Sequence, residues 1–210
     1  WSTEIANYFY KKKYNVIVYL KKRGGIDKTY DIRKLPFKIS LIGGRDWAYF
    51  KKWYIIISMF NYLRQYKKPI IISTNWELSQ GLIFYKKYFK FSLITILHGL
   101  EVTRLESKKY SKKIADFKKS LTLSDRVIAV SNYTKSKADV ILGNKKEIDV
   151  IPNFVNTKFF YPINDKKIYD KYNLNSNDTI LLSLSRIIRR KGHYIAIDAV
   201  KSLVKIYPNI

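Results

Sequence analysis

Short apolar runs alternate with longer amphipathic segments along most of the chain. The runs rich in β-branched residues are expected to be strands, at residues 15–20, 38–42, 70–73, 93–97, 126–130, 149–151 and 179–184. Most of these runs are apolar at consecutive positions, as in parallel strands buried on both faces rather than half-exposed antiparallel strands. The pattern therefore predicts a parallel sheet with helices on both of its faces.

The segments between these runs carry a helical period. Helices are expected at residues 3–13, 47–66, 79–90, 105–121 and 132–142, with a short one at 166–172. Near the end of the chain, apolar residues recur at helical spacing from Ala196 to Val204, and Pro208 follows as a stop. This alternation of strands and helices predicts a doubly wound α/β fold.

The region between Ile151 and Thr179 is rich in Asn, Asp and Pro and is interpreted as a crossing between two domains, residues 1–160 and 161–210. The helix at 3–13 leads directly into a strand, so a further strand is expected before it. One strand at 179–184 cannot form the sheet that the last helix needs. We therefore expect the first strand and most of the second domain to lie outside these 210 residues.

Composition narrows the class of protein. A hydrophobic content of 47% excludes a disordered polymer, and the absence of cysteine excludes disulfides and thiolate metal sites and fits a reducing compartment. With only two histidines, no metal site is expected. No apolar run is long enough to span a bilayer, and the first residues lack the pattern of a secretory signal. Because the chain begins with Trp1, its start is interpreted as cut.

The formal net charge is +25, but the charge is spread evenly. Residues 1–164 carry 32 Lys and Arg against 12 Asp and Glu, and residues 165–210 carry 9 against 4. Codon drift in an AT-rich genome and an anion-binding surface explain this excess equally well. Two stretches have the aromatic or amphipathic basic character of membrane-surface helices, Leu82–Phe91 and Arg104–Lys119. The alternative for both is a core-packing helix with a solvated lysine face.

The loop after the predicted strand at 179–184 is basic and carries Arg186 and Lys191, with Gly192 before the last helix. In an open α/β sheet, ligands bind at the carboxyl ends of the strands, where a helix N-terminus attracts phosphate. A guanidinium and an ammonium group together can neutralise a diphosphate. The alternative is a solvated basic loop. Arg189 and Arg190 are expected to face solvent.

Polar residues also follow the other predicted strands. His98 follows the strand at 93–97, Gly99 permits an unusual backbone angle there, and Glu101 is either a site residue or a first-turn helix acid. A lone histidine is more often structural than functional.

Three further residues follow strands in the same way. Asn75 contacts a polar ligand or caps the following helix, a role it shares with Thr74, and Ser131 is most simply an N-cap. Asn153 braces the cleft or forms a turn.

Four motifs in this order, HGLE, SDRVIAVSNYTKSKA, VIPNFVNTKFFYP and LLSLSRIIRRKGHYIAIDAV, resemble glycosyltransferase family 4, the group 1 glycosyl transferases of GT-B fold. The resemblance covers residues 15–210 and is strongest after Leu93. It implies two Rossmann-like domains facing across a cleft, an N-terminal acceptor-side domain and a C-terminal domain that binds the nucleotide-sugar. It also implies metal-independent transfer of a sugar from a nucleotide-diphosphate-sugar donor with retention of configuration, and no cofactor.

The resemblance assigns roles to the matching positions. Arg186 and Lys191 would bind the donor diphosphate, Gly192 would open the helix beside the phosphates, and His98 would contact the transferring sugar. This makes His98, Arg186 and Lys191 the expected catalytic residues. Asn75, Glu101 and Asn153 are expected on the acceptor or cleft side.

Within these 210 residues, the sequence departs from the family pattern at one place. After the crossing asparagine the family usually has glycine, valine and aspartate, whereas this chain has Phe154, Val155 and Asn156. The family's glycine-rich loop and its paired donor-binding glutamates are expected outside these 210 residues. We therefore expect the 210 residues alone to be inactive.

The resulting expectation is a hexosyltransferase that uses a saccharide or lipid-linked acceptor in surface polysaccharide, lipopolysaccharide or glycolipid synthesis. It is expected in the cytoplasm, with peripheral contact to the anionic inner face of the cytoplasmic membrane and no nucleic-acid partner. The alternatives are another GT-B enzyme, such as a starch- or sucrose-type synthase or a nucleotide-sugar epimerase, and a non-catalytic basic module that binds membrane or nucleic acid.

Overall fold

The computed structural model describes residues 2–21, 34–42, 47–163, 166–175 and 177–207. The chain divides into two compact units, Trp1–Phe154 and Val155–Ile210, and each is described by itself. The domain roles assigned from the resemblance stay predictions.

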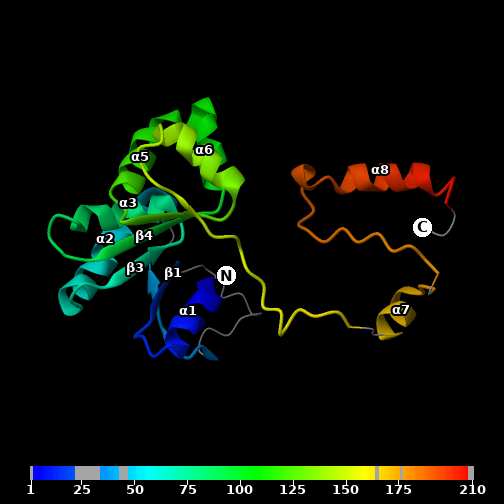
Figure 1. Ribbon diagram of the computed structural model, residues 1–210, viewed down its shortest axis with the longest axis horizontal. Helices are drawn as coiled ribbons and strands as arrows, with labels where there is room; N and C mark the ends of the chain where they lie inside the picture. Colours follow the sequence, from blue (N-terminus) through cyan, green and yellow to red (C-terminus); the bar gives the residue numbers. More distant parts are fainter. Residues whose placement is uncertain (1, 22–33, 43–46, 164–165, 176, 208–210) are drawn as a thin grey trace. The chain divides into compact units, whose positions relative to one another are not determined.

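The first unit alternates strands and helices as the sequence predicts (Figure 1). Its strands are β1 Ile17–Lys21, β2 Lys38–Ile42, β3 Ile70–Ser73, β4 Ser92–Leu97, β5 Arg126–Ala129 and β6 Asp149–Val150. Its helices are α1 Ser2–Lys11, α2 Trp47–Gln65, α3 Trp76–Tyr85, α4 Leu100–Thr103, α5 Ile114–Thr122 and α6 Asn132–Leu142, with 3-10 turns η2 Arg104–Glu106 and η3 Lys108–Lys113.

All strand pairs in the described residues are parallel. β1 pairs with β2, and β3, β4, β5 and β6 form a four-stranded sheet in that order. The α/β class with parallel sheets is therefore confirmed. Because neighbouring strands run the same way, the turns that follow β3, β4, β5 and β6 all lie along one edge of the sheet. This edge is called the carboxyl edge below.

Two predicted helices are wrong in detail. The helix expected at residues 79–90 is α3, which begins earlier, at Trp76, and ends earlier, at Tyr85. The single helix expected over residues 105–121 is divided into η2, η3 and α5. Ser107 between the two 3-10 turns has an extended backbone, with φ −84° and ψ 141°, which ends the helical path. The break allows Leu105 on one side and Phe117 and Leu121 on the other to be buried in the same core. The apolar residues keep their helical spacing across this break, so the sequence pattern alone does not reveal it.

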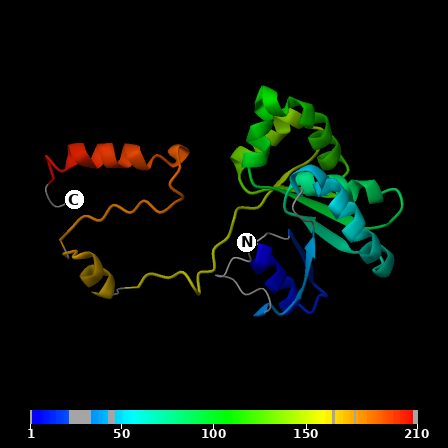
Figure 2. The ribbon, with the colours of Figure 1, turned by 180° about the vertical axis from the view of Figure 1, so that it is seen from behind.

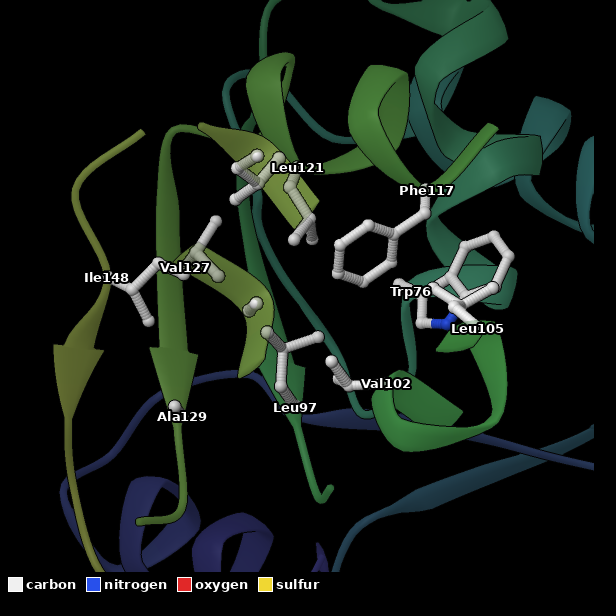
Figure 3. Packing of buried hydrophobic residues seen from close by; sticks show 11 residues of the cluster. Trp76, Leu97, Val102, Leu105, Phe117, Leu121, Val127, Ala129 and Ile148 are labelled. Carbon is white, nitrogen blue, oxygen red and sulfur yellow. The ribbon is translucent and has the colours of Figure 1, made fainter. Parts of the chain in front are cut away.

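The main core lies against one face of β4 and β5. Leu97, Val127 and Ala129 of the strands are fully buried there, with Phe117 and Leu121 of α5 above them (Figure 3). The rings of Trp76 and Phe117 meet edge to face at 5.4 Å. A second cluster continues the core under α2 and α3 and includes Ile56, Met59, Leu63, Ile83 and Leu93.

The opposite face of the four-stranded sheet is less completely covered by the described residues. Ile72 pairs with Ile94, and Ile96 pairs with Ile128. Ile96 is buried, but Ile72, Ile94 and Ile128 are only half-buried and Ile70 is 64% exposed. Burial in this unit is therefore concentrated on the face that α3, α5 and α6 cover.

A chain of buried hydroxyl groups joins α3, β4 and the turn after α5. Ser124 Oγ donates to the backbone oxygen of Ser120 at 2.8 Å. With its proton used there, Ser124 Oγ accepts from Thr95 Oγ1 at 2.7 Å, and Thr95 Oγ1 accepts from Ser79 Oγ at 2.8 Å. Because a buried hydroxyl without a partner is costly, this chain of hydrogen bonds fixes how α3 and α5 sit on β4.

The carboxylate of Asp125 joins the starts of β4 and β5. Asp125 Oδ2 accepts from Lys86 Nζ and, at 2.6 Å, from the N–H of Leu93, while the N–H of Asp125 donates to the Leu93 oxygen at 2.8 Å. Burial raises the pKa of Asp125, but these two hydrogen bonds together with the nearby lysine charges outweigh it and hold the pKa below its usual value. The end of α3 is thereby tied to the end of the sheet opposite the carboxyl edge.

The second unit contains α7 Lys166–Tyr172, the 3-10 turn η4 Arg189–Lys191 and α8 His193–Leu203. The strand predicted at residues 179–184 is wrong for this structure, since these residues pair with no strand in the described part of the chain. Leu182 and Leu184 are 82% and 88% exposed. A parallel strand exists only with a neighbour that supplies its hydrogen bonds, and the described residues of this unit offer none. For the same reason the apolar stripe of α8 is not buried here.

We expect Thr95→Val to lower the free energy of unfolding by about 1–3 kcal/mol, because it removes the central hydroxyl of the buried chain while keeping the side-chain shape. Equilibrium urea unfolding measures this. Ser120→Ala is the matched control, since Ser120 Oγ is buried and has no hydrogen-bond partner among the described residues. The control should change stability by no more than about 0.5 kcal/mol. Equal losses in both variants would contradict the assigned role of the chain.

Candidate functional site

The turn after β3 carries Asn75 at the carboxyl edge. Asn75 has an extended backbone and its Oδ1 accepts from the N–H of Glu77 at 2.8 Å, so the predicted cap of α3 is confirmed and Asn75 is the capping residue. Ser73 Oγ donates to the Asn75 backbone oxygen at 2.9 Å, which stiffens the same turn. The amide oxygen of Asn75 is thus used within the fold, and its role toward an acceptor stays a prediction.

The turn after β4 carries His98, Gly99 and Glu101. The carboxylate of Glu101 accepts from the N–H of His98 at 2.5 Å and closes the turn at the start of α4. This contact is the one that a first-turn helix acid makes. The His98 side chain is exposed at the edge, directly after the buried Leu97.

Gly99 is required at this turn for two separate reasons. Its backbone φ is +104°, a value that residues with a Cβ rarely adopt. A Cβ at this position would also lie 3.1 Å from Thr134 Oγ1. Thr134 is in the first turn of α6, where its N–H donates to Ser131 Oγ at 3.1 Å. The predicted N-cap at Ser131 is therefore confirmed, and the turn that carries His98 packs against the start of α6.

Further hydrogen bonds connect the turns along the carboxyl edge. Trp76 Nε1 donates to the Glu101 backbone oxygen at 3.4 Å, which connects the turns after β3 and β4. The N–H of Ile151 donates to the Ala129 oxygen at 3.0 Å, so pairing continues past β6 and leaves Asn153 exposed two residues beyond. Asn75, His98 and Asn153 thus share the carboxyl edge of one sheet.

The second unit contains the residues of the predicted anion site, and their binding role stays a prediction. Arg186 and Lys191 are exposed, and neither forms an ion pair among the described residues. Gly192 has φ +70° and is the N-cap of α8, so the prediction that this helix starts after Gly192 is confirmed. The first turn of a helix has backbone N–H groups without intrahelical acceptors, and these favour an anion. Arg189 and Arg190 are exposed, as expected.

His193 was not singled out from the sequence, yet it organises this loop. Its Nδ1 lies 2.9 Å from Ser183 Oγ, and its Nε2 lies 2.8 Å from Ser185 Oγ and 3.2 Å from the Arg186 backbone oxygen. A carbonyl oxygen only accepts, so Nε2 carries the proton and Nδ1 accepts from Ser183. The imidazole thus fixes the backbone at Arg186. The available signal was the alternation of serines at 183 and 185 before a histidine at the helix start.

The remaining candidate features lie elsewhere or are not seen. An open hollow follows α6, and its lining contains none of the predicted site residues; it is formed by Asn132, Lys135, Ser136, Asp139, Val140, Gly143 and Asn144. Across the described residues, no three His, Asp or Glu side chains gather as a metal site would require, and the expected independence of metal stays a prediction. None of the described helices combines the length and apolar content that a bilayer crossing requires.

Comparisons with known proteins bear on the family and on the fold of this chain. The model of a family described as Glycosyltransferase Family 4 matches residues 2–159. The mannosylglucosylglycerate synthase of Petrotoga mobilis is 44% identical over 75 residues, which cover 33% of this chain and 17% of that protein. The solved structure of sucrose-phosphate synthase from Thermosynechococcus elongatus is similar with a TM-score of 0.77 and 17% identity, over 95% of this chain and 53% of that one.

The family match and the structural similarity cover different properties of the chain. The family match includes β1 to β6 and the residues of the carboxyl edge. The structural likeness, at 17% identity, shows the fold alone. The chain spans about half the length of the synthase structure and a smaller share of the curated relative.

We expect Gly99→Ala to destabilise the protein by more than Gly143→Ala, its matched control. Both glycines have positive φ, +104° and +64°, but only the Cβ added at residue 99 meets another atom, whereas that at residue 143 lies in open space. The control should cost about 1–2 kcal/mol for its backbone conformation, and Gly99→Ala should exceed it. Thermal unfolding of both variants measures the difference. Equal shifts would show that Thr134 yields and that the contact is unimportant.

Proposed function

The chain belongs to glycosyltransferase family 4, and from this premise we propose that the protein transfers a sugar from a nucleotide-diphosphate-sugar to a saccharide or lipid-linked acceptor with retention of configuration. The proposed enzyme is of hexosyltransferase type. Its proposed products are surface polysaccharide, lipopolysaccharide or glycolipid, made in the cytoplasm at the inner face of the cytoplasmic membrane.

The observation that carries the proposal is the loop at the start of α8. Arg186 and Lys191 are exposed on either side of a short 3-10 turn, and Gly192 then begins a helix of 11 residues with its first N–H groups directed outward along the helix axis. Two cations and a helix N-terminus on one loop form a binding site for a diphosphate. A basic loop that only faces solvent would not require the hydrogen bonds by which His193 fixes the backbone at Arg186.

The chemistry follows from where charge develops. In the proposed reaction the bond between the anomeric carbon and the donor phosphate oxygen breaks, and its electron pair stays on the departing diphosphate. The oxygen of an acceptor hydroxyl forms the new glycosidic bond, and its proton passes to the leaving phosphate. Arg186 and Lys191 neutralise the diphosphate as its charge increases, so they stabilise the transition state more than the bound donor. This step needs no metal ion.

The carboxyl edge of the first unit supports the acceptor side of the proposal. His98 is exposed there on a turn that Gly99 and Glu101 hold rigidly, which suits contact with the transferring sugar. Asn75, Glu101 and Asn153 are proposed to line the same side. Of these, Asn153 is exposed at the end of the sheet, whereas Asn75 and Glu101 first serve the turns themselves.

We expect Arg186→Ala to reduce the turnover number for glycosyl transfer by about 10²–10³, because one donor to the developing charge is lost. The fold should be unaffected, since the side chain is exposed. Transfer is assayed with the full-length protein and the nucleotide-sugars that raise its melting temperature. Arg190→Ala, on the same loop, is the matched control and should retain activity. Unchanged turnover in Arg186→Ala would remove this residue from the donor site.

We expect His193→Ala to lower kcat/KM for the nucleotide-sugar by about tenfold, a loss of about 1.4 kcal/mol, because the backbone at Arg186 loses a hydrogen bond and becomes less ordered. His193 is a positioning residue in this account. In a protein that already carries Arg186→Ala, the same substitution should have little further effect. A tenfold loss in both backgrounds would show that His193 acts independently of Arg186.

If no nucleotide-sugar stabilised the full-length protein and DNA bound with steep salt dependence, a basic binding module would replace the proposed enzyme.

A further inference from the structure

The outer side of α2 and α3 exposes large apolar side chains. Trp53, Ile57 and Phe60 of α2 are 58%, 70% and 42% exposed, and Phe84 of α3 and Tyr88 just beyond it are 48% and 68% exposed. These residues are called the aromatic face. Large exposed apolar surfaces rimmed by polar residues usually bind something. We propose that the aromatic face docks the protein on an anionic lipid bilayer.

The spacing on α2 separates this face from the core. Ile56, Met59 and Leu63 on the inner side are buried, whereas Trp53, Ile57 and Phe60 follow one another at helical spacing on the outer side. α2 is therefore apolar on two sides, and packing inside the first unit uses only one of them. The hydroxyl of Tyr85 donates to the Ile56 backbone oxygen at 2.6 Å, which fixes the inner side of α2 on α3.

Ring contacts make the face continuous across the two helices. The Phe60 ring lies 6.3 Å from the rings of Tyr85 and Phe89, and the Phe84 ring lies 5.8 Å from that of Tyr88. The guanidinium of Arg64 lies over Phe60, 5.6 Å from the ring centre. The helices lie side by side in both views of the ribbon (Figure 1 and Figure 2). Because the Tyr85 ring also lies 5.3 Å from that of Phe84, Phe60 is connected through Tyr85 to Phe84 and Tyr88. Trp53 and Ile57 extend the same side of α2 by their helical spacing.

The charge around this face selects the partner. Residues 47–91 contain eight Lys and Arg but only one acid, Glu77. Glu77 is paired with Lys113 at 3.0 Å. The exposed cations that belong to this region include Arg64, Lys67, Lys68, Lys87 and Lys90. A surface that combines aromatic rings with lysines and nearly lacks acids suits the boundary of anionic headgroups and acyl chains. A second copy of the same basic surface would be repelled.

The other basic stretch identified from the sequence, Arg104–Lys119, lacks this combination. Its large apolar residues Leu105 and Phe117 are buried, and Tyr110 and Ile114 pack against the core. The outward side therefore presents charge without apolar side chains, as a solvated face does. Within Leu82–Phe91, by contrast, Phe84 and Tyr88 are exposed while Leu82 and Phe91 are buried.

The aromatic face and the carboxyl edge do not compete for space. Lys86, just after α3, contacts Phe91 and Asp125 at the starts of β4 and β5, so the end of α3 lies at the end of the sheet opposite His98. Docking through Phe84 and Tyr88 leaves the turn of His98 open. Bilayer docking does not depend on the proposed transfer reaction, although it would bring a lipid-linked acceptor close to the protein.

The test is co-sedimentation of the full-length protein with vesicles of phosphatidylcholine alone or mixed in equal parts with phosphatidylglycerol. The unchanged protein should bind the mixed vesicles and bind phosphatidylcholine alone at least tenfold more weakly. Trp53→Ser with Ile57→Ser should weaken binding to mixed vesicles at least tenfold. Lys87→Glu with Lys90→Glu should do the same and reduce the dependence on phosphatidylglycerol.

Matched controls distinguish the surface from general charge. Tyr133→Ser with Val140→Ser removes apolar side chains of α6 that are 62% and 80% exposed, and Lys118→Glu with Lys119→Glu reverses charges on α5. Both controls should bind mixed vesicles as the unchanged protein does. Equal losses in controls and test variants would overturn the proposal. The proposal would also be overturned if the unchanged protein bound no vesicles and substitutions in the aromatic face converted a dimer into a monomer. The aromatic face would then be a contact between two copies of this chain.

A thermal shift with nucleotide-sugars, measured on the same variants, keeps this inference separate from the proposed function. We expect the shift to persist in every variant, because none of the changed residues belongs to the His98 turn or to the Arg186 loop. Vesicle binding without any nucleotide-sugar shift would leave docking intact and remove the proposed donor. A shift without vesicle binding would do the reverse.

Discussion

The central position of β4 in the four-stranded sheet constrains everything else in the first unit. β4 pairs in parallel with β3 on one side and β5 on the other, and Leu93, Thr95 and Leu97 are fully buried on the face beneath α3 and α5. Its register is fixed because a shift by one residue would turn Thr95 away from Ser79 and Ser124 and leave buried hydroxyl groups without these partners. The turn after it, with His98, is therefore held at one place.

The same constraint gives polar groups a specific role in the core. Thr95 faces the helices between Leu93 and Leu97, and its hydroxyl forms hydrogen bonds with Ser79 and Ser124. A purely apolar contact would allow α3 to slide on the sheet, whereas a chain of hydrogen bonds permits few arrangements. Trp76 and Asn75 are positioned through α3, and the turns at the carboxyl edge meet because α3 is fixed.

The loop of the second unit obtains its order in another way. No described residue from 155 to 207 is fully buried, so local hydrogen bonds rather than a core shape the backbone at Arg186. His193 provides three such contacts from the first residue of α8. Chemistry and docking are thus proposed for different parts of the molecule: the donor on this loop, the sugar and acceptor at the carboxyl edge, and the lipid on the outer side of α2 and α3.

The sequence by itself determined the local elements. β-Branched runs predicted β1 to β6, helical spacing predicted α6 at its observed bounds, and the positions of Asn75 and Ser131 before helices predicted their caps, because all of these depend on a few neighbouring residues. Order and motifs also predicted the family.

Only the tertiary structure decided what depends on partners distant in sequence. An apolar run at 179–184 looks like β4 in sequence, but a strand needs a neighbour, and here it has none among the described residues. Trp53 and Met59 are both large apolar residues of α2, yet Trp53 is exposed and Met59 is buried, because packing against α3 selects one side of α2. The bonds of His193 to two serines likewise follow from how the chain returns on itself, which composition and spacing do not encode.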